Sequence, residues 1–494
     1  MNQINNFAAD FVKYAPGHLI PALLGLIAIP ILTRLLSPED FGLYILVITT
    51  ISVLTILTGW LAMSVIRYYP VADRDGRLES LFASTTAGLL VSMMVISSFF
   101  YFILYLIKHS VGVYLYQLML IGVVVFALTA PFEMLMSFLR ARREAVWYSL
   151  FSTWRAIASI IIGIGLVASY RFGVEGLLWG SVVSVAISLP LLWKIAIDNL
   201  PKINNISAEL MKEMVKYSFP LVVGNLAAWL ISLSDRYVIE LFRGTQEVGI
   251  YSASYSISEK SLFLLTSLFL LTSGPLSVQV WEKDGEKEAR DFVSSITRYY
   301  LLLSLPAAVG LSVLAIPVTK VFIGEAYYEG YRIMPFIALG GLLFGLQQRF
   351  QVSFVFLKKT SLITAAIVIA GLINVALNLL LVPEYGYMAA AITTLISYTI
   401  LLFVMVIFSR RYFIWDFPFK SLARAIMASA IMGATVYQVG NSLTSSPLIN
   451  LFLGIFVGAI VYILMLFLLK EIQKEEVQLL LKFRDKMIGW IRNG

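Results

Sequence analysis

The sequence contains no cysteine and only two histidines among its 494 residues. It therefore has no disulfide framework, no thiolate metal site and no cysteine nucleophile. It also lacks a GxxxxGK[ST] phosphate-binding loop, an HExxH pair and a GxSxG elbow, the signatures of nucleotide binding, zinc proteases and serine hydrolases. We expect no enzymatic activity, no metal and no cofactor, and an energy source other than ATP hydrolysis by this chain.

Charged residues are scarce as well. They make up 13% of the chain, whereas hydrophobic residues make up 59% and the mean hydropathy is +0.86. Soluble domains carry about 25% charged residues, so a soluble protein of this length could not cover its surface. The composition excludes a soluble enzyme, a nucleic-acid-binding protein and a disordered chain, despite the net charge of +8.

Long apolar runs account for this hydropathy. A bilayer core of about 30 Å requires about 20 apolar residues per helix, and about fourteen runs of this kind can be delimited. Most lack the alternating pattern of a transmembrane barrel, so we predict an all-α polytopic membrane protein. The predicted spans are residues 15–36, 41–66, 81–107, 112–139, 150–169, 174–197, 217–241, 248–278, 296–322, 333–357, 361–382, 386–408, 421–440 and 448–469.

The positive charges predict the orientation. With the loops assigned alternately to the two sides, one side receives most of the 37 Lys and Arg residues. The other side receives only Arg34, Lys108, Arg171, Arg243, Lys320 and Arg332. Because cytoplasmic loops are enriched in Lys and Arg, both termini are predicted to be cytoplasmic.

Two pairs of turns indicate an internal repeat. The segment RLLSPEDFGLY ending at Tyr44 resembles LFRGTQEVGIY ending at Tyr251, which aligns Gly42 with Gly249. The segments following Phe172 and Tyr385 resemble each other in the same way and align Gly173 with Gly386. Parallel repeats of this kind predict two six-helix lobes around a central cavity.

We therefore expect five parts along the chain. They are an N-lobe (1–197), a cytoplasmic amphipathic linker (198–216), a C-lobe (217–408), two further spans (409–469) and a cytoplasmic amphipathic tail (470–494). The linker and the tail both place apolar residues on one helical face, which is typical of segments that lie at the membrane interface.

Ionisable residues inside the spans are the candidate functional residues, because a charge is costly in the membrane. Lys260 is predicted to lie near the midplane, with Asp235 or Glu259 as an alternative structural partner. Arg349 lies deep in its span, and an arginine can bind phosphate bidentately. Arg236 is a further candidate for substrate contact in the cavity. It lies with Asp235 near an outer end of its span, where an outer gate or a structural role is as consistent as substrate contact.

Other charges lie nearer the span ends. Glu133 is expected to pair with an arginine of the cavity, and Arg155 to reach the cytoplasmic interface. Arg34 and Arg67 could line the cavity rim or contact lipid headgroups. Positive groups outnumber negative ones among these residues, which favours an anionic substrate such as one that carries phosphate.

Four segments resemble the Wzx-type polysaccharide-repeat flippases of the MOP exporter superfamily. The resemblance implies two six-helix lobes around a cationic cavity, in a bacterial or archaeal cytoplasmic (inner) membrane. It also implies an oligosaccharide substrate linked through diphosphate to undecaprenol. The segments are TRLLSPEDFGLYILV (Thr33–Val47), SDRYVIELFRGTQEVGIYSASYSIS (Ser234–Ser258), FIGEAYYEGYRIMP (Phe322–Pro335) and NVALNLLLVPEYGYMAAAITTLISY (Asn374–Tyr398).

Two alternatives are kept at this point. A MATE-like ion-coupled small-molecule exporter shares the superfamily, although such exporters usually carry a carboxylate in the first span and this chain has none there. A polymerase or ligase acting on the same lipid would need catalytic residues on a long outer loop, and the predicted outer loops are short. We expect a monomer surrounded by membrane lipid, with other polysaccharide assembly proteins as candidate partners and no nucleic acid.

Overall fold

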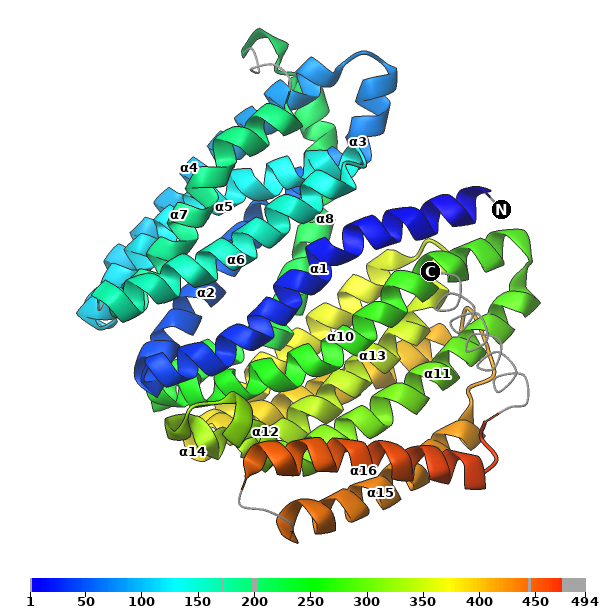
Figure 1. Ribbon diagram of the computed structural model, residues 1–494. Helices are drawn as coiled ribbons and strands as arrows, with labels where there is room; N and C mark the ends of the chain where they lie inside the picture. The colour runs from blue at the N-terminus through cyan, green and yellow to red at the C-terminus, as the bar shows by residue number, and fades with distance from the viewer. Residues whose placement is uncertain (1, 171, 198–202, 443–445, 473–494) are drawn as a thin grey trace, which may run out of the picture. The chain divides into compact units, whose positions relative to one another are not determined.

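The computed structural model describes residues 2–170, 172–197, 203–442 and 446–472, and within these ranges the regular secondary structure is entirely helical (Figure 1). The first half contains α1 (Asn2–Leu35), α2 (Pro38–Thr58), α3 (Trp60–Arg74), α4 (Leu78–Ile107), α5 (Val113–Ala141), α6 (Ala145–Tyr170), α7 (Gly173–Ala196), η1 (Ile203–Asn205) and α8 (Ala208–Leu233). The second half contains α9 (Asp235–Arg243), α10 (Thr245–Lys283), α11 (Glu286–Val313), α12 (Ala315–Phe322), η2 (Glu325–Ile333), α13 (Met334–Phe356), α14 (Thr360–Ser409), α15 (Phe419–Ser442) and α16 (Pro447–Leu468).

Each predicted apolar run falls on these helices, but several helices extend well beyond it: α1 begins at Asn2 rather than at residue 15, and α11 begins at Glu286 rather than at residue 296. Three of the runs are interrupted, at Gly59, Ser234 and Leu314, so each forms a longer and a shorter helix. Ten helical stretches of the described chain are long and apolar enough to cross a membrane, and residues 360–409 count as one of them. The chain is therefore a multi-pass membrane protein, while the total of about fourteen spans remains a prediction.

The two amphipathic segments are described only in part. Residues 198–202 of the linker and 473–494 of the tail lie outside the described residues. The rest of the linker contains η1 and the start of α8, which is capped by the Ser207 hydroxyl accepting from Leu210 N at 3.2 Å. Because α8 then continues without a break to Leu233, its first turns belong to the same helix as the predicted span.

The chain divides into two compact units, which are described separately here. Unit 1 comprises residues 1–257, 322–330 and 361–397, and unit 2 comprises the remainder. In unit 1, α6 packs against α1 and α7, and α5 packs against α2, α3 and α7. In unit 2, α11 packs against α13 and α15, and α15 packs against α16. The boundaries of the two units differ from those of the predicted lobes. Helices α8, α9 and the start of α10 belong to unit 1, although most of this stretch is assigned to the predicted C-lobe.

Helix α14 is two helices joined at Gly386, where φ is 60°. Thr393 Oγ1 donates to Asn378 Oδ1 at 2.5 Å, although fifteen residues of straight helix would separate them by about 22 Å. The second half of α14 therefore runs back alongside the first. Gly173, its predicted repeat partner, has a φ of 57° at the start of α7, and both positions suit glycine because it tolerates positive φ.

The other predicted repeat pair forms a close contact within unit 1. A β-carbon on Gly42 would lie 2.0 Å from the Thr245 carbonyl oxygen, and one on Gly249 would lie 1.9 Å from that of Pro38. Only residues without a side chain permit this approach of α2 to α10. The start of α2 is fixed by Ser37, whose hydroxyl accepts from Asp40 N at 3.1 Å, and by Pro38 in the first turn.

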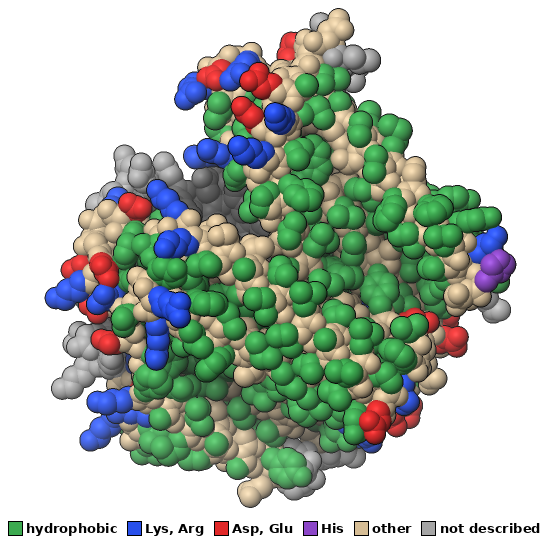
Figure 2. Space-filling view, turned by 180° about the vertical axis from the view of Figure 1, so that it is seen from behind, with side chains coloured by type: hydrophobic (Ala, Val, Ile, Leu, Met, Phe, Trp, Pro, Cys, Tyr) green, Lys and Arg blue, Asp and Glu red, His purple; other side chains and the backbone are tan. Residues whose placement is uncertain are grey.

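The surface is consistent with a membrane environment. Figure 2 shows hydrophobic side chains over most of the face in view, with charged side chains gathered toward its margins. Large side chains such as Phe99 of α4 and Leu380 of α14 are exposed, at 64% and 72%. Apolar exposure on this scale marks a surface that contacts lipid or another protein.

Candidate functional site

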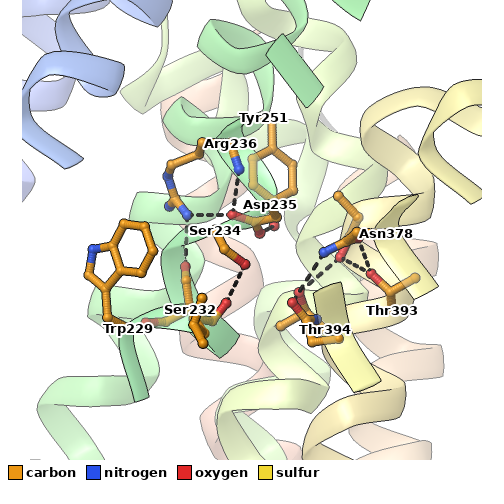
Figure 3. A network of polar contacts seen from close by, with 12 residues as sticks. Trp229, Ser232, Ser234, Asp235, Arg236, Tyr251, Asn378, Thr393 and Thr394 are labelled. Carbon is orange, nitrogen blue, oxygen red and sulfur yellow. Dashed lines mark hydrogen bonds and ion pairs between the residues drawn. The ribbon is translucent and has the colours of Figure 1, made fainter. Parts of the chain in front are cut away.

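A buried ion pair lies where α8 ends and α9 begins. Arg236 Nη1 contacts Asp235 Oδ1 at 2.8 Å, and both side chains are almost fully buried. The Tyr251 hydroxyl donates to the other carboxylate oxygen, and Arg236 Nη1 also donates to the Ser232 carbonyl at 2.7 Å. Figure 3 shows Arg236 and Tyr251 converging on Asp235 from two sides.

This pair forms a self-contained network. The Arg236 guanidinium lies 4.6 Å from the ring centroid of Tyr255, and the Arg236 amide donates to Asp235 Oδ1 at 2.9 Å. Both carboxylate oxygens of Asp235 thus have donors, and opposite charges offset each other in a buried place. Asp235 and Arg236 are the first two residues of α9, and Asp235 Oδ1 accepts from both the backbone amide and the guanidinium of Arg236.

Arg349 of α13 is different, because its charge is not matched by a carboxylate among the described residues. It is 3% exposed, Nη1 donates to Ser273 Oγ at 2.7 Å, and its guanidinium lies 5.8 Å from the ring centroid of Tyr300. Within the described part of the chain, Arg349 Nε and Nη2 have no hydrogen-bond partner. Buried charges are normally paired, so these two nitrogens can donate to an anion.

A second polar group of α13 shares this property. Gln347 is 1% exposed, and its Oε1 has no partner among the described residues. Gln347, Ser273 and Tyr300 could not be predicted from the sequence, because they are uncharged and belong to no motif. A polar residue within an apolar run, two positions from Arg349, is the one signal that could have indicated Gln347.

Lys260 and Glu259 lie on α10, and both are partly buried. They belong to unit 2, which also contains Arg349. Glu259 directly precedes Lys260 along α10, and its role as the charge partner of this lysine stays a prediction. The other expected partner, Asp235, instead accepts from Arg236 and Tyr251.

The remaining candidates lie in unit 1. Glu133 has the arginine partner expected for it, since Arg155 Nη1 contacts Glu133 Oε1 at 2.6 Å and the guanidinium lies 5.0 Å from the Phe132 ring centroid. Sequence reasoning did not identify Arg155 as that partner. Arg34 and Arg67 are both exposed, and Arg34 Nη1 donates to the Pro30 carbonyl at 2.8 Å. Exposed positions of this kind can contact lipid headgroups or solvent.

Comparison with known proteins decides the family. A family model described as "Polysaccharide biosynthesis protein" matches residues 31–332, which is more than half of the chain. The chain belongs to this family. The expected resemblance to Wzx-type flippases of the MOP superfamily is thereby confirmed.

Curated relatives of the chain are distant in sequence. The chain is 24% identical over 310 residues to a probable low-salt glycan biosynthesis flippase of Haloferax volcanii, covering 63% of this chain and 64% of the relative. It is 22% identical to a succinoglycan biosynthesis transport protein of Rhizobium meliloti, with coverages of 64% and 62%. A putative O-antigen transporter of Shigella flexneri is 24% identical over 398 residues, with coverages of 76% and 91%. The first two alignments span a little under two thirds of those relatives.

Solved structures share the fold of this chain. The lipid II flippase MurJ in an inward closed conformation matches with a TM-score of 0.75 and 18% identity, covering 92% of this chain and 98% of that one. An inward-facing MATE multidrug transporter of the MOP superfamily matches with a TM-score of 0.67 and 13% identity, covering 81% and 97%. The chain therefore has a MOP-type helical fold.

Proposed function

We propose that this protein is a flippase. It moves a polyprenyl-diphosphate-linked oligosaccharide from the cytoplasmic to the outer leaflet of the cytoplasmic membrane, for the biosynthesis of a surface polysaccharide. Family membership supports this proposal, as do relatives whose names describe glycan flippases and transporters. The proposed activity is transport without catalysis, and the carrier lipid is undecaprenol.

The proposed architecture is two six-helix lobes, residues 1–197 and 217–408, which alternate in opening a central cavity to each side of the membrane. Both termini are cytoplasmic, helices α15 and α16 are an addition to the two lobes, and one chain acts as a monomer. The reciprocal contact of Gly42 and Gly249 and the shared positive φ of Gly173 and Gly386 support the underlying duplication.

The observation that carries the proposed substrate site is the buried guanidinium of Arg349. Its Nε and Nη2 donors are unused within the described chain, and an arginine can bind phosphate through two parallel hydrogen bonds. We assign Arg349 to the diphosphate, with Lys260 as a second cation. Arg34 and Arg67 are assigned to the cavity rim.

The ion pairs receive a different role. The Arg236–Asp235 pair has all of its carboxylate oxygens satisfied, so we assign it to holding the α8–α9 junction during gating. We also assign two other carboxylates as charge partners during gating. Glu133 is the partner of Arg155 and Glu259 is the partner of Lys260.

The test asks whether flipping requires a positive charge at position 349. Variants of Arg349 are expressed in a strain whose own flippase gene is deleted, and the side of the membrane on which lipid-linked oligosaccharide accumulates is measured. We expect Arg349→Gln to leave lipid-linked oligosaccharide on the cytoplasmic side and Arg349→Lys to retain part of the activity, because lysine keeps the charge but not the bidentate geometry. Arg290→Gln is the control, since Arg290 lies in an exposed pair with Glu286. Wild-type flipping by Arg349→Gln at normal protein levels contradicts the site, and drug sensitivity of the deletion with intact polysaccharide favours the MATE-like alternative.

A further inference from the structure

Unit 2 contains a groove that the proposed transport site does not use. It encloses about 630 Å³ between α13, the end of α14, the connector 410–418 and the start of α15. Its walls are mostly aromatic and aliphatic, and its polar residues are Ser409, Arg410 and Asp416.

The aromatic wall is preformed. The Phe350 ring centroid lies 5.2 Å from that of Trp415 and 6.1 Å from that of Phe417, and the Trp415 and Phe417 centroids are 5.8 Å apart. The connector is held against α11, because the Ser294 hydroxyl donates to the Asp416 carbonyl at 2.6 Å. A rigid apolar wall of this kind suits a hydrocarbon chain.

Two of the three polar residues of the groove, Ser409 and Arg410, are adjacent at the end of α14. Arg410 is exposed, and no ion pair involves it among the described residues. Ser409 is 1% exposed, lines the groove, and its hydroxyl has no partner in the described part of the chain. A guanidinium and an unused hydroxyl among the lining residues of an apolar groove match an amphiphile with an anionic head.

The charge of Asp416 distinguishes between two possible lipid headgroups, a diphosphate and a single phosphodiester. The carboxylate of Asp416 also borders the groove, and it would repel a diphosphate more strongly than a single phosphodiester. The position, at the boundary where a membrane-length helix ends, is the level at which bilayer headgroups lie.

We propose that this groove binds an anionic glycerophospholipid of the bilayer. Arg410 binds the lipid phosphate, Ser409 donates to it, and one acyl chain lies along Phe350, Trp415 and Phe417. The bound lipid contacts α13, α14, α15 and the connector between α14 and α15. This site is separate from Arg349 and does not depend on the transported substrate.

The test uses Trp415 as a reporter in nanodiscs. Brominated phosphatidylglycerol quenches a tryptophan that it contacts, and the difference between wild type and Trp415→Phe isolates this signal from the other eight of the nine tryptophans. We expect half-maximal quenching at a mole fraction at least about tenfold lower for brominated phosphatidylglycerol than for brominated phosphatidylcholine.

Arg410→Gln should remove this preference, whereas Arg411→Gln should retain it. Arg411 is the matched control because it is adjacent, is exposed, lies 5.9 Å from the Phe408 ring centroid and does not line the groove. Equal quenching by both lipids, or equal behaviour of both variants, overturns the proposal. Displacement of phosphatidylglycerol by equimolar undecaprenyl phosphate overturns it too, because the groove would then belong to the substrate carrier. None of these readouts requires transport, so they are independent of the proposed flippase activity.

Discussion

Gly42 and Gly249 make a reciprocal contact, in which each packs against the carbonyl oxygen of the residue four positions before the other. Gly42 faces the Thr245 oxygen and Gly249 faces the Pro38 oxygen. Reciprocity of this kind is the property of an interface with two-fold symmetry. Within one chain, it indicates that the starts of α2 and α10 are equivalent elements of a repeat.

This contact predicts that alanine is not tolerated at either glycine. Gly42→Ala or Gly249→Ala would place a β-carbon about 2 Å from a backbone oxygen, and the helices would have to separate, at a cost of about 1–3 kcal/mol. We expect a lower thermal unfolding temperature for the purified protein. Gly112→Ala is the control, because no atom lies within 4 Å of a β-carbon there and its φ is −55°. An unchanged unfolding temperature in both variants would show that the contact is not close in solution.

The absence of cysteine allows a direct test of topology. Single cysteines at Arg142, Lys283 and Arg243 can be introduced without removing native thiols. We expect a membrane-impermeant maleimide to label Arg243→Cys in intact cells, and to label Arg142→Cys and Lys283→Cys only after the membrane is opened. The reverse pattern would contradict both the orientation and the assignment of lobes.

The Asp235–Arg236 pair predicts strong non-additivity. Asp235→Ala leaves a buried cation without its partner and should destabilise the protein by about 3–5 kcal/mol, whereas replacing both residues with apolar ones should restore much of this loss. Thermal unfolding of Asp235→Ala and of the Asp235→Ala/Arg236→Met double variant measures the difference. A stable double variant that still transports assigns Arg236 to structure, and a stable one that does not transport assigns it to the substrate.

Glu471 predicts a dependence of stability on acid pH. Its burial raises the pKa, but hydrogen bonds from Arg424, Ser421 and Arg298 outweigh burial and lower the pKa from 4.5. A lowered pKa in the folded state means that the stabilisation is full above the unfolded pKa and is lost as the pH falls through the folded value. Arg298 Nε lies 2.6 Å from Glu471 Oε1 and Arg424 Nη1 lies 2.9 Å from Oε2, so this carboxylate joins α11 and α15 just beyond α16.

Glu471→Gln should therefore lower the unfolding temperature at neutral pH and flatten its fall below about pH 4.5. Glu286→Gln serves for comparison, since its pair with Arg290 is exposed and contributes little. If both variants follow the wild-type pH profile, Glu471 does not stabilise the fold in the manner described.

The helical class and the approximate positions of the helices could be predicted from the sequence. A run of about 20 apolar residues matches the length of a membrane-spanning helix, and few other structures accommodate it. The sequence did not predict the interruptions at Gly59, Ser234 and Leu314, which depend on packing rather than on local composition. Arg349 was identifiable as a buried charge. Its contact with Ser273 was not, because the two residues lie 76 positions apart. The pairing of Asp235 with Arg236 joins adjacent residues of α9. Adjacent side chains of a helix do not normally face each other, so no spacing rule could have indicated this pair.

The left-handed residue in α14 also bears on how the chain enters the membrane. A straight helix of 50 residues would be about 75 Å long, more than twice the hydrocarbon thickness of a bilayer. We therefore expect residues 361–408 to enter the membrane as a helical hairpin whose tip is Gly386. A β-branched residue there would disfavour the hairpin, and the segment could then be inserted with its second half on the wrong side. We expect a substitution of Gly386 to impair membrane insertion more than it lowers the stability of the folded protein.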